Sequence, residues 1–346
     1  MLLQQFPDKA IFRRLFEKHN VVPVCREILA DMETPVSVLK KLYQEKSPAF
    51  LLESVEGGER WGRYSFLSTS ARARIRLFRD ALEIAKNGRT ERLAHHGNPL
   101  PALRALMRDH DPAEVEGLPR FWGGLVGYFT YEMVSFFESI ENRLPPERPL
   151  ADFVMPDEML IFDNIRNTLM MVAITFKADS GDADAAYAAA ENRINALQHR
   201  IRAIGNNEMA TAGQTTAGIT LRPAHEPLRY QRSVEKVKSH ITAGDVIQTV
   251  ISQPFTTGGH VPDPTALYRA QRYINPSPYM FFLHLDDTTL VGSSPETMVR
   301  LENGIATLRP IAGTRPRGKT EQADRALASE MLQDEKERAE HLMLVD

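Results

Sequence analysis

The sequence predicts an α+β fold in which largely antiparallel sheets are packed with helices. Short apolar runs bounded by glycine or polar turns indicate strands in the first half of the chain, and an alanine-rich stretch indicates a long helix. Two hairpin turns follow in the second half. With 346 residues, the chain is long enough for two domains of ordinary size.

Composition limits the partners of this chain. A formal net charge of −3 gives no basic surface of the kind that binds nucleic acid or an anionic membrane. No apolar run approaches the roughly 18 residues of a membrane span, and the N-terminus lacks a signal-peptide core. The single cysteine, Cys25, excludes an internal disulfide and fits a reducing compartment. We therefore expect a cytoplasmic protein with no nucleic-acid or membrane partner.

The first half of the chain mixes strands with a long helix. Residues 178 to 203 follow an Asp- and Ser-rich start and place Ile194, Leu197 and Ile201 at helical spacing. Three segments before this helix have the composition of strands with glycine or polar ends. They are residues 47 to 54, 121 to 132 and 158 to 164.

A composition change marks the boundary between the two expected domains. Residues 204 to 219 are small and polar, as in a linker. This places an N-terminal domain at residues 1 to 203 and a second domain at residues 220 to 346. The second domain begins with a helix from about residue 228 that is stopped by Gly244, because glycine tolerates the left-handed conformation that ends helices.

Two hairpin turns fix the strand register after that helix. They lie at residues 286–287 and 303–304, and the second is the stronger signal because Asn-Gly favours a two-residue turn. Counting outward from the turns gives the cross-strand partners. The predicted pairs are Met280 with Ser293, Glu302 with Ile305, and Glu296 with Ile311.

The register brings three short sequences together at one end of a meander. They are "PSPYM" (276–280), "SSPE" (293–296) and "PIAGT" (310–314). Gly313 and Thr314 supply backbone N–H groups, a hydroxyl and little bulk, which suits a carboxylate or phosphate. The alternative is a surface turn with solvated arginines. Glu296, at the neighbouring strand end, is a candidate general acid if desolvation keeps its proton on near neutral pH, and is otherwise a solvated glutamate.

Residues 334 to 346 are predicted to form a helix with Glu337, Glu340 and His341 near one another. One carboxylate here could ligate a hard cation, although magnesium needs further oxygen ligands; the alternative is a solvated charged face. The helix stops on apolar residues with no glycine cap and no polar tail. We therefore expect that the chain is cut inside a domain.

Seven segments carry a family resemblance in order over nearly the whole chain. They are "FLLESVEGGERWGRYSF" (50–66), "GGLVGYFTYE" (123–132), "GDVIQTVISQ" (244–253), "NPSPYMF" (275–281), "GSSPE" (292–296), "RPIAGTRPRGKT" (309–320) and "DEKERAEHLMLVD" (334–346). Together they resemble component I, the large subunit, of anthranilate synthase. The resemblance implies a two-domain sandwich of mainly antiparallel sheets with packed helices.

The activity that this resemblance implies is the first step of tryptophan biosynthesis. The family converts chorismate and ammonia to anthranilate and pyruvate with Mg²⁺, and a glutamine amidotransferase partner, component II, supplies the ammonia. Gly313 and Thr314 match the positions that hold the chorismate carboxylate, and Glu340 matches the first magnesium ligand. Glu296 matches the acid that protonates the departing ring hydroxyl. Other family site residues lie beyond Asp346, so we expect the 346-residue chain alone to be inactive.

Two positions distinguish among enzymes that use chorismate. Ala312 stands where aminodeoxychorismate synthases usually carry a lysine nucleophile, so that covalent route has no amine here. Gln248 stands where isochorismate and salicylate synthases carry a lysine that deprotonates water. A neutral amide cannot act as that base, whereas ammonia needs none. Both residues favour anthranilate synthase over aminodeoxychorismate synthase and over isochorismate-type enzymes.

The resemblance also implies a regulatory site for L-tryptophan. Glu53 and Ser54 match one wall of the family's inhibitor site, and Pro278, Tyr279 and Met280 match the other. Without the resemblance, these residues would be interpreted as a buried strand and a packed turn. Because both walls are present while part of the active site is not, a non-catalytic tryptophan-binding fragment is a further alternative.

Overall fold

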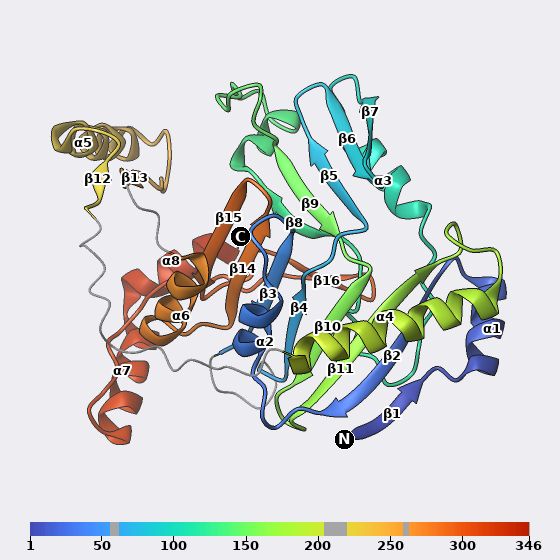
Figure 1. Ribbon diagram of the computed structural model, residues 1–346. Helices are drawn as coiled ribbons and strands as arrows, with labels where there is room; N and C mark the ends of the chain where they lie inside the picture. The colour runs from blue at the N-terminus through green and yellow to red at the C-terminus, as the bar shows by residue number, and fades with distance from the viewer. Residues whose placement is uncertain (56–61, 204–219, 259–262, 346) are drawn as a thin grey trace. The chain divides into compact units, whose positions relative to one another are not determined.

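A computed structural model describes residues 1–55, 62–203, 220–258 and 263–345 (Figure 1). The predicted linker, residues 204–219, lies outside the described residues. The chain forms two compact units. The larger contains Met1–Gly205 with Leu267–Asp346, and the smaller contains Asn206–Ala266.

An eight-stranded sheet forms the centre of the larger unit, and all its neighbouring strands are antiparallel. In spatial order the strands are β1 (Leu2–Phe6), β2 (Val21–Leu29), β11 (Thr168–Phe176), β10 (Glu158–Asp163), β4 (Tyr64–Ser68), β3 (Ala49–Glu53), β14 (Tyr279–Leu285) and β15 (Thr288–Ser294). Strands β14 and β15, orange in Figure 1, thus extend a sheet built from N-terminal strands. The predicted division between residues 203 and 220 therefore differs from the compact units, because this sheet contains strands from both sides of it.

A five-stranded antiparallel sheet packs against one face of the eight-stranded sheet. Its strands in order are β7 (Arg89–Ala94), β6 (Ala81–Lys86), β5 (Ala73–Leu77), β9 (Ala151–Met155) and β8 (Val126–Phe129). The apolar core between the sheets includes Ile75, Val154 and Val172. Strands β8 and β9 approach closely at Gly127, where a Cβ atom would lie 1.9 Å from the Asp152 carbonyl oxygen, so only glycine fits.

Helices cover the opposite face of the eight-stranded sheet. All nine residues of strand β11 are buried, because both faces of the sheet are covered at this strand. Met170, Val172 and Ile174 face the core between the sheets, while Leu169 and Met171 face the helices. The helices of this second core are α1 (Lys9–Lys18), α2 (Pro35–Leu42) and α4 (Ala183–Ala203). Helix α3 (Leu100–Arg108) and the 3₁₀ helix Tyr131–Phe136 lie between β7 and β9 in the sequence.

The α+β class and the long helix before the boundary are confirmed. Helix α4 begins at Ala183, five residues later than predicted, and the Asp182 side chain explains this start. Its Oδ1 accepts hydrogen bonds from the backbone N–H groups of Asp184 and Ala185 at 2.7 and 3.1 Å. A side-chain acceptor at this position satisfies the first N–H groups of a helix. The three predicted strands correspond to β3, β8 and β10.

The hairpin registers are confirmed near the two turns. Met280 pairs with Ser293 in β14–β15, and Glu302 pairs with Ile305 between the short strands β16 and β17. The predicted pair of Glu296 with Ile311 is wrong as a strand pair, because β16 and β17 form a separate two-stranded sheet that is only three residues long. The remaining elements of this part are α6 (Pro264–Ile274), β16 (Arg300–Glu302), β17 (Ile305–Thr307), α7 (Glu321–Gln333) and α8 (Glu335–Val345).

The smaller unit contains the helix predicted after the linker. Helix α5 (Pro227–Ala243) ends at Gly244, whose φ of 81° is the left-handed conformation expected there. Two short strands, β12 (Arg222–Pro223) and β13 (Phe255–Thr256), pair with each other. Across all the residues that the structure describes, no helix combines the length and apolarity needed to cross a membrane.

Candidate functional site

Glu53 ends strand β3 as a buried carboxylate that is only 5% exposed. The Tyr268 hydroxyl of α6 donates a hydrogen bond to Glu53 Oε2 at 2.6 Å, and the Arg272 Nε atom lies 3.2 Å from the same oxygen. A buried carboxylate needs such partners to offset the loss of water. Burial, reinforced by the Glu53 charge, raises the pKa of the Tyr268 hydroxyl, which therefore remains a donor.

The two segments expected to form a tryptophan site adjoin each other. Met280 is the cross-strand partner of Glu53, and the Val55 N–H donates to the Ser277 carbonyl oxygen at 3.1 Å. The Ser54 Oγ atom is buried and has no hydrogen-bond partner in the described part of the chain. A buried hydroxyl without a partner costs about 1 to 3 kcal/mol, so a polar ligand atom beside it would be stabilising. Pro278 and Tyr279, like Ser54, are half-buried.

Serine side chains connect this turn to the strand end that carries Glu296. The Ser293 hydroxyl donates to the Asn275 carbonyl oxygen at 2.7 Å, and the Ser277 hydroxyl donates to the Ser294 carbonyl oxygen. The Ser294 hydroxyl in turn donates to the Glu296 carbonyl oxygen at 2.9 Å. These hydrogen bonds join the turn to the end of β15.

Glu296 is exposed, and its Oε1 atom accepts a hydrogen bond from the Ile311 N–H at 3.2 Å. The carboxylate and the "PIAGT" segment are thus brought together as expected, but through a side chain instead of a strand ladder. The described residues do not desolvate this carboxylate. Its role as a general acid stays a prediction.

The loop that contains Gly313 packs directly against helix α8. A Cβ atom at Gly313 would lie 2.1 Å from Glu337 Oε2, so a larger residue would displace that carboxylate. Arg315 donates to Glu337 at 2.8 Å and to Asp334 at 2.9 Å, and its Nε lies 3.3 Å from Glu330 Oε1. The hydrogen bond with Glu337 is the main cause of the raised pKa of Arg315. The alternative of a surface turn with solvated arginines is therefore wrong for Arg315, because three carboxylates surround its guanidinium.

The end of the same loop is held by the first turn of α7. Asp324 Oδ1 accepts from the Gly318 N–H at 2.8 Å, and Asp324 Oδ2 lies 2.7 Å from Arg317 Nη2. The hydrogen bond from the Gly318 N–H is the main cause of the lowered pKa of Asp324, and the hydrogen bond from Arg317 is the second. Thr314 is exposed, and its carbonyl oxygen accepts from Arg315 at 3.1 Å. The loop conformation is thus maintained by charged side chains near the surface.

The predicted magnesium ligand, Glu340, is half-buried on α8. Among the residues that the structure describes, no group of three or more His, Cys, Asp or Glu side chains is arranged to hold a metal ion. Magnesium prefers about six oxygen ligands, so these residues do not by themselves form its site. The role of Glu340 stays a prediction.

Gln248 belongs to the smaller unit, where it is exposed in a segment without regular secondary structure. Its catalytic role also stays a prediction. Sequence reasoning missed Tyr268, Arg272 and the contacts between Arg315 and its three carboxylates. The first two lie on a helix more than 200 residues from Glu53 in the sequence, so no local pattern relates them to it.

A comparison with known protein families identifies the class of this chain. The family model described as chorismate binding enzyme matches residues 49–346. The chain therefore belongs to the chorismate-binding enzymes.

Its relatives include several proteins named anthranilate synthase component 1. The protein from Aquifex aeolicus (strain VF5) is 40% identical over 336 residues, which are 96% of this chain and 67% of the relative. That from Acetivibrio thermocellus is 37% identical over 347 residues, covering 99% of this chain and 69% of the relative. The chain thus spans about two thirds of the length of these relatives.

Two solved structures share the fold. Anthranilate synthase component I from Streptococcus pneumoniae TIGR4 matches 92% of this chain and 66% of its own, with a TM-score of 0.67 and 27% identity. The menaquinone-specific isochorismate synthase from Escherichia coli matches 97% of this chain with a TM-score of 0.53 and 14% identity. The second likeness concerns the fold alone.

Proposed function

We propose that this chain is the chorismate-converting component of an anthranilate synthase, acting in the first step of tryptophan biosynthesis in the cytoplasm. Chorismate and ammonia would give anthranilate and pyruvate, with a glutamine amidotransferase as the source of ammonia. The similarity to anthranilate synthase component 1 over nearly the whole chain carries this proposal.

Two side chains support this reaction over its relatives. Ala312 offers only a methyl group beside the Gly313 loop, so it cannot form the covalent amine intermediate of a lysine-dependent enzyme. Gln248 is a neutral amide and cannot remove a proton from water. Ammonia is nucleophilic without a base, so its addition is the chemistry that these residues leave open.

The candidate site residues have separate roles in this proposal. The backbone at Gly313 and Thr314 would bind a carboxylate of chorismate, and Glu296 would donate a proton to the leaving ring hydroxyl, which departs as water. Glu340 would supply one oxygen ligand to Mg²⁺. The described residues do not complete the coordination shell of the metal, so the roles of Gly313, Thr314 and Glu296 are proposed without it.

Feedback inhibition by L-tryptophan is part of the same proposal. The buried Ser54 hydroxyl without a partner supports it, as does the adjoining segment of Pro278, Tyr279 and Met280. Tyr268 and Arg272 hold the Glu53 carboxylate in place through a hydrogen bond and an ion pair. The serine hydrogen bonds to the β15 end give a short route from the inhibitor to Glu296, although proximity alone does not establish coupling.

A single set of assays tests both parts of the proposal. The natural polypeptide that contains this sequence is incubated with chorismate, ammonium and Mg²⁺, and the product is identified by fluorescence and mass while tryptophan is titrated. We expect anthranilate as the main product and inhibition by tryptophan. Ser54→Phe, which fills the space beside the hydroxyl, should abolish inhibition and spare turnover. The matched variant Ser54→Ala removes only the hydroxyl and should weaken inhibition about three- to tenfold, as expected for one hydrogen bond.

Each outcome separates the alternatives. Aminodeoxychorismate or isochorismate as the main product would overturn the assignment. Inhibition of Ser54→Phe at wild-type tryptophan concentrations would place the regulatory site elsewhere. Tryptophan binding by calorimetry, with no conversion of chorismate, would favour the second candidate function, a tryptophan-binding fragment. The pairing of Glu53 with Met280 favours this alternative, because the described residues bring both walls of the tryptophan site together but do not complete a magnesium site.

A further inference from the structure

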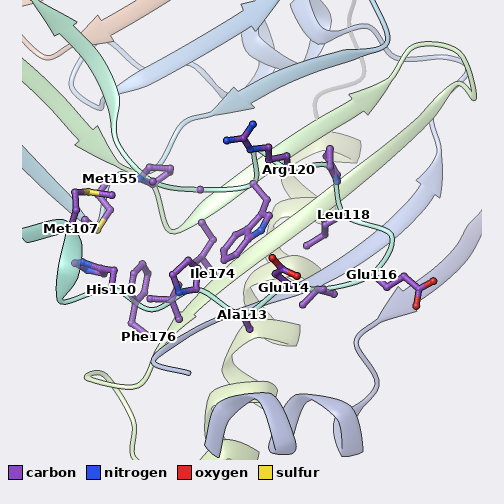
Figure 2. A pocket seen from close by; sticks show the side chains of 18 residues that line it. Met107, His110, Ala113, Glu114, Glu116, Leu118, Arg120, Met155, Ile174 and Phe176 are labelled. Atoms are coloured by element: carbon purple, nitrogen blue, oxygen red, sulfur yellow. The ribbon is translucent and has the colours of Figure 1, made fainter. Parts of the chain in front are cut away.

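A cavity of about 850 Å³ lies in the larger unit, apart from Glu53 and Glu296. It is formed by the segment from Met107 to Gly124 together with the ends of β2, β9 and β11 (Figure 2). Its volume is within the range of sites that enclose small molecules. None of the residues considered above for chorismate, magnesium or tryptophan lines it.

Three glycine residues lie in the segment from Met107 to Gly124 that forms this cavity. Gly117 and Gly124 have φ angles of +92° and +113°, which other residues rarely adopt. A Cβ atom at Gly123 would lie 2.9 Å from Ile174 Cδ1, which is closer than packed carbon atoms normally approach. The Ala113 N–H donates to the Val21 carbonyl oxygen at 2.9 Å and fixes the other side of the segment to β2. The backbone of this segment is thus defined by its glycine conformations and by its hydrogen bond to β2.

The cavity has an apolar and aromatic interior. Ala113 is buried, and Ile174 and Phe176 of β11 are 2% and 7% exposed. The His110 and Phe176 rings meet edge to face with centroids 6.0 Å apart. The Trp122 side chain lines the cavity and packs against the core between the sheets. Such a surface favours a ligand with a flat or branched apolar body.

Two polar side chains that line the cavity are His110 and Glu114. His110 Nδ1 lies 2.8 Å from the Leu106 carbonyl oxygen, which can only accept, so Nδ1 is the donor of this hydrogen bond. Glu114 is exposed and forms no hydrogen bond or ion pair with the part of the chain that the structure describes. Figure 2 shows the Glu114 carboxylate directed among the lining side chains, whereas Glu116 points away from them.

The one guanidinium that lines the cavity has other partners. Arg120 Nη1 lies 2.8 Å from Glu302 Oε1, and its Nη2 donates to the Leu301 carbonyl oxygen at 2.9 Å. In Figure 2 the Arg120 side chain extends away from Glu114. The unpaired charge that faces the cavity is therefore negative, which disfavours a carboxylate or phosphate ligand and favours a cation.

We propose that this cavity binds a small arylalkyl ammonium compound, with its ring against Trp122, Ile174 and Phe176 and its ammonium group beside Glu114. The ligand class follows from the apolar interior and from Glu114, which Figure 2 shows directed among the lining side chains, unlike the second lining carboxylate, Glu116. This site is independent of the proposed conversion of chorismate and of the proposed tryptophan site.

The test uses three matched probes with the natural polypeptide that contains this sequence, in calorimetry and ligand-observed NMR. The probes are 2-phenylethylamine, its neutral analogue 2-phenylethanol and the anion 3-phenylpropionate. We expect saturable binding of the amine with an affinity at least fivefold above that of the alcohol, and no binding of the anion. Glu114→Gln should weaken amine binding about three- to fivefold, as for a partly exposed ion pair, and leave alcohol binding unchanged.

Matched variants distinguish this cavity from other acidic surfaces. Glu116→Gln removes the same charge two residues away and should leave amine affinity unchanged. Trp122→Leu removes an aromatic wall and should weaken the amine and the alcohol alike, with circular dichroism to verify folding. Ser54→Phe should have no effect. The proposal is overturned if the amine does not saturate, if the alcohol binds equally well, or if the two glutamate variants behave alike.

Discussion

Glu53 and Glu296 are both carboxylates at strand ends, but the structure holds them in different ways. Glu53 is buried within a sheet, where backbone pairing with Met280 and side chains from α6 determine its position. Glu296 is exposed and contacts a loop that ion pairs around the half-buried Arg315 hold in place. Backbone pairing and burial are not weakened by electrostatic screening, whereas ion pairs near the surface are screened by salt. The two regions should therefore respond differently to mutation, pH and ionic strength.

The largest contrast is expected from truncation of apolar side chains near each carboxylate. Phe282 in β14 is fully buried and packs edge to face against the Tyr43 ring, 5.5 Å away. Phe282→Ala should lower the free energy of unfolding by about 3 to 5 kcal/mol. Leu301 in β16 is 65% exposed, and Leu301→Ala should change the free energy of unfolding by less than about 0.5 kcal/mol. Urea titration measures both, and similar losses would contradict the contrast.

A smaller effect is expected from the hydroxyl that supports Glu53. Tyr268→Phe keeps the ring but removes the donor to a buried carboxylate, which should cost about 1 to 3 kcal/mol of unfolding free energy. The folded pKa of Tyr268 is raised, mainly by burial, above its unfolded value of about 10. Its contribution is therefore complete below about pH 10 and is lost as pH rises through the folded pKa.

Alkaline unfolding curves check the sign of this effect. The stability difference between wild type and Tyr268→Phe should be constant at neutral pH and should shrink above about pH 10. Tyr230→Phe is a suitable control, because Tyr230 is 39% exposed. A difference that grows with rising pH would show that Tyr268 does not retain its proton on folding.

The smallest effect on global stability is expected from the Arg315 ion pairs. Arg315→Gln removes the charge that holds Glu330, Asp334 and Glu337 together. We expect an unchanged thermal midpoint but faster hydrogen exchange at residues 312–318, because the loop loses its anchor. Salt at 1 M should increase exchange in wild type and have little further effect in the variant. Arg325→Gln, which removes an exposed pair within α7, is the control and should leave exchange in the loop unchanged.

Local sequence signals predicted the fold elements accurately where one residue dominates a turn or helix end. Asn303 and Gly304 both adopt positive φ angles of 50° and 77°, as their type of hairpin requires, and Gly244 ends α5. The register around the first hairpin followed from its turn, so the contact between the "PSPYM" and "SSPE" segments was predictable. The extrapolation to Glu296 and Ile311 failed because it assumed that β16 and β17 continue beyond three residues.

The sequence by itself determined the α+β class, the hairpin registers near the two turns and the family resemblance, because these depend on neighbouring residues and on motif order. Only the tertiary structure decided that Glu53 is buried beside Tyr268, that Arg315 is surrounded by carboxylates, and that Trp122 lines a cavity. Each of these features depends on side chains from different elements of the fold. The burial of a charge, and the partner that compensates it, are properties of the packed chain and leave no periodic pattern in the sequence.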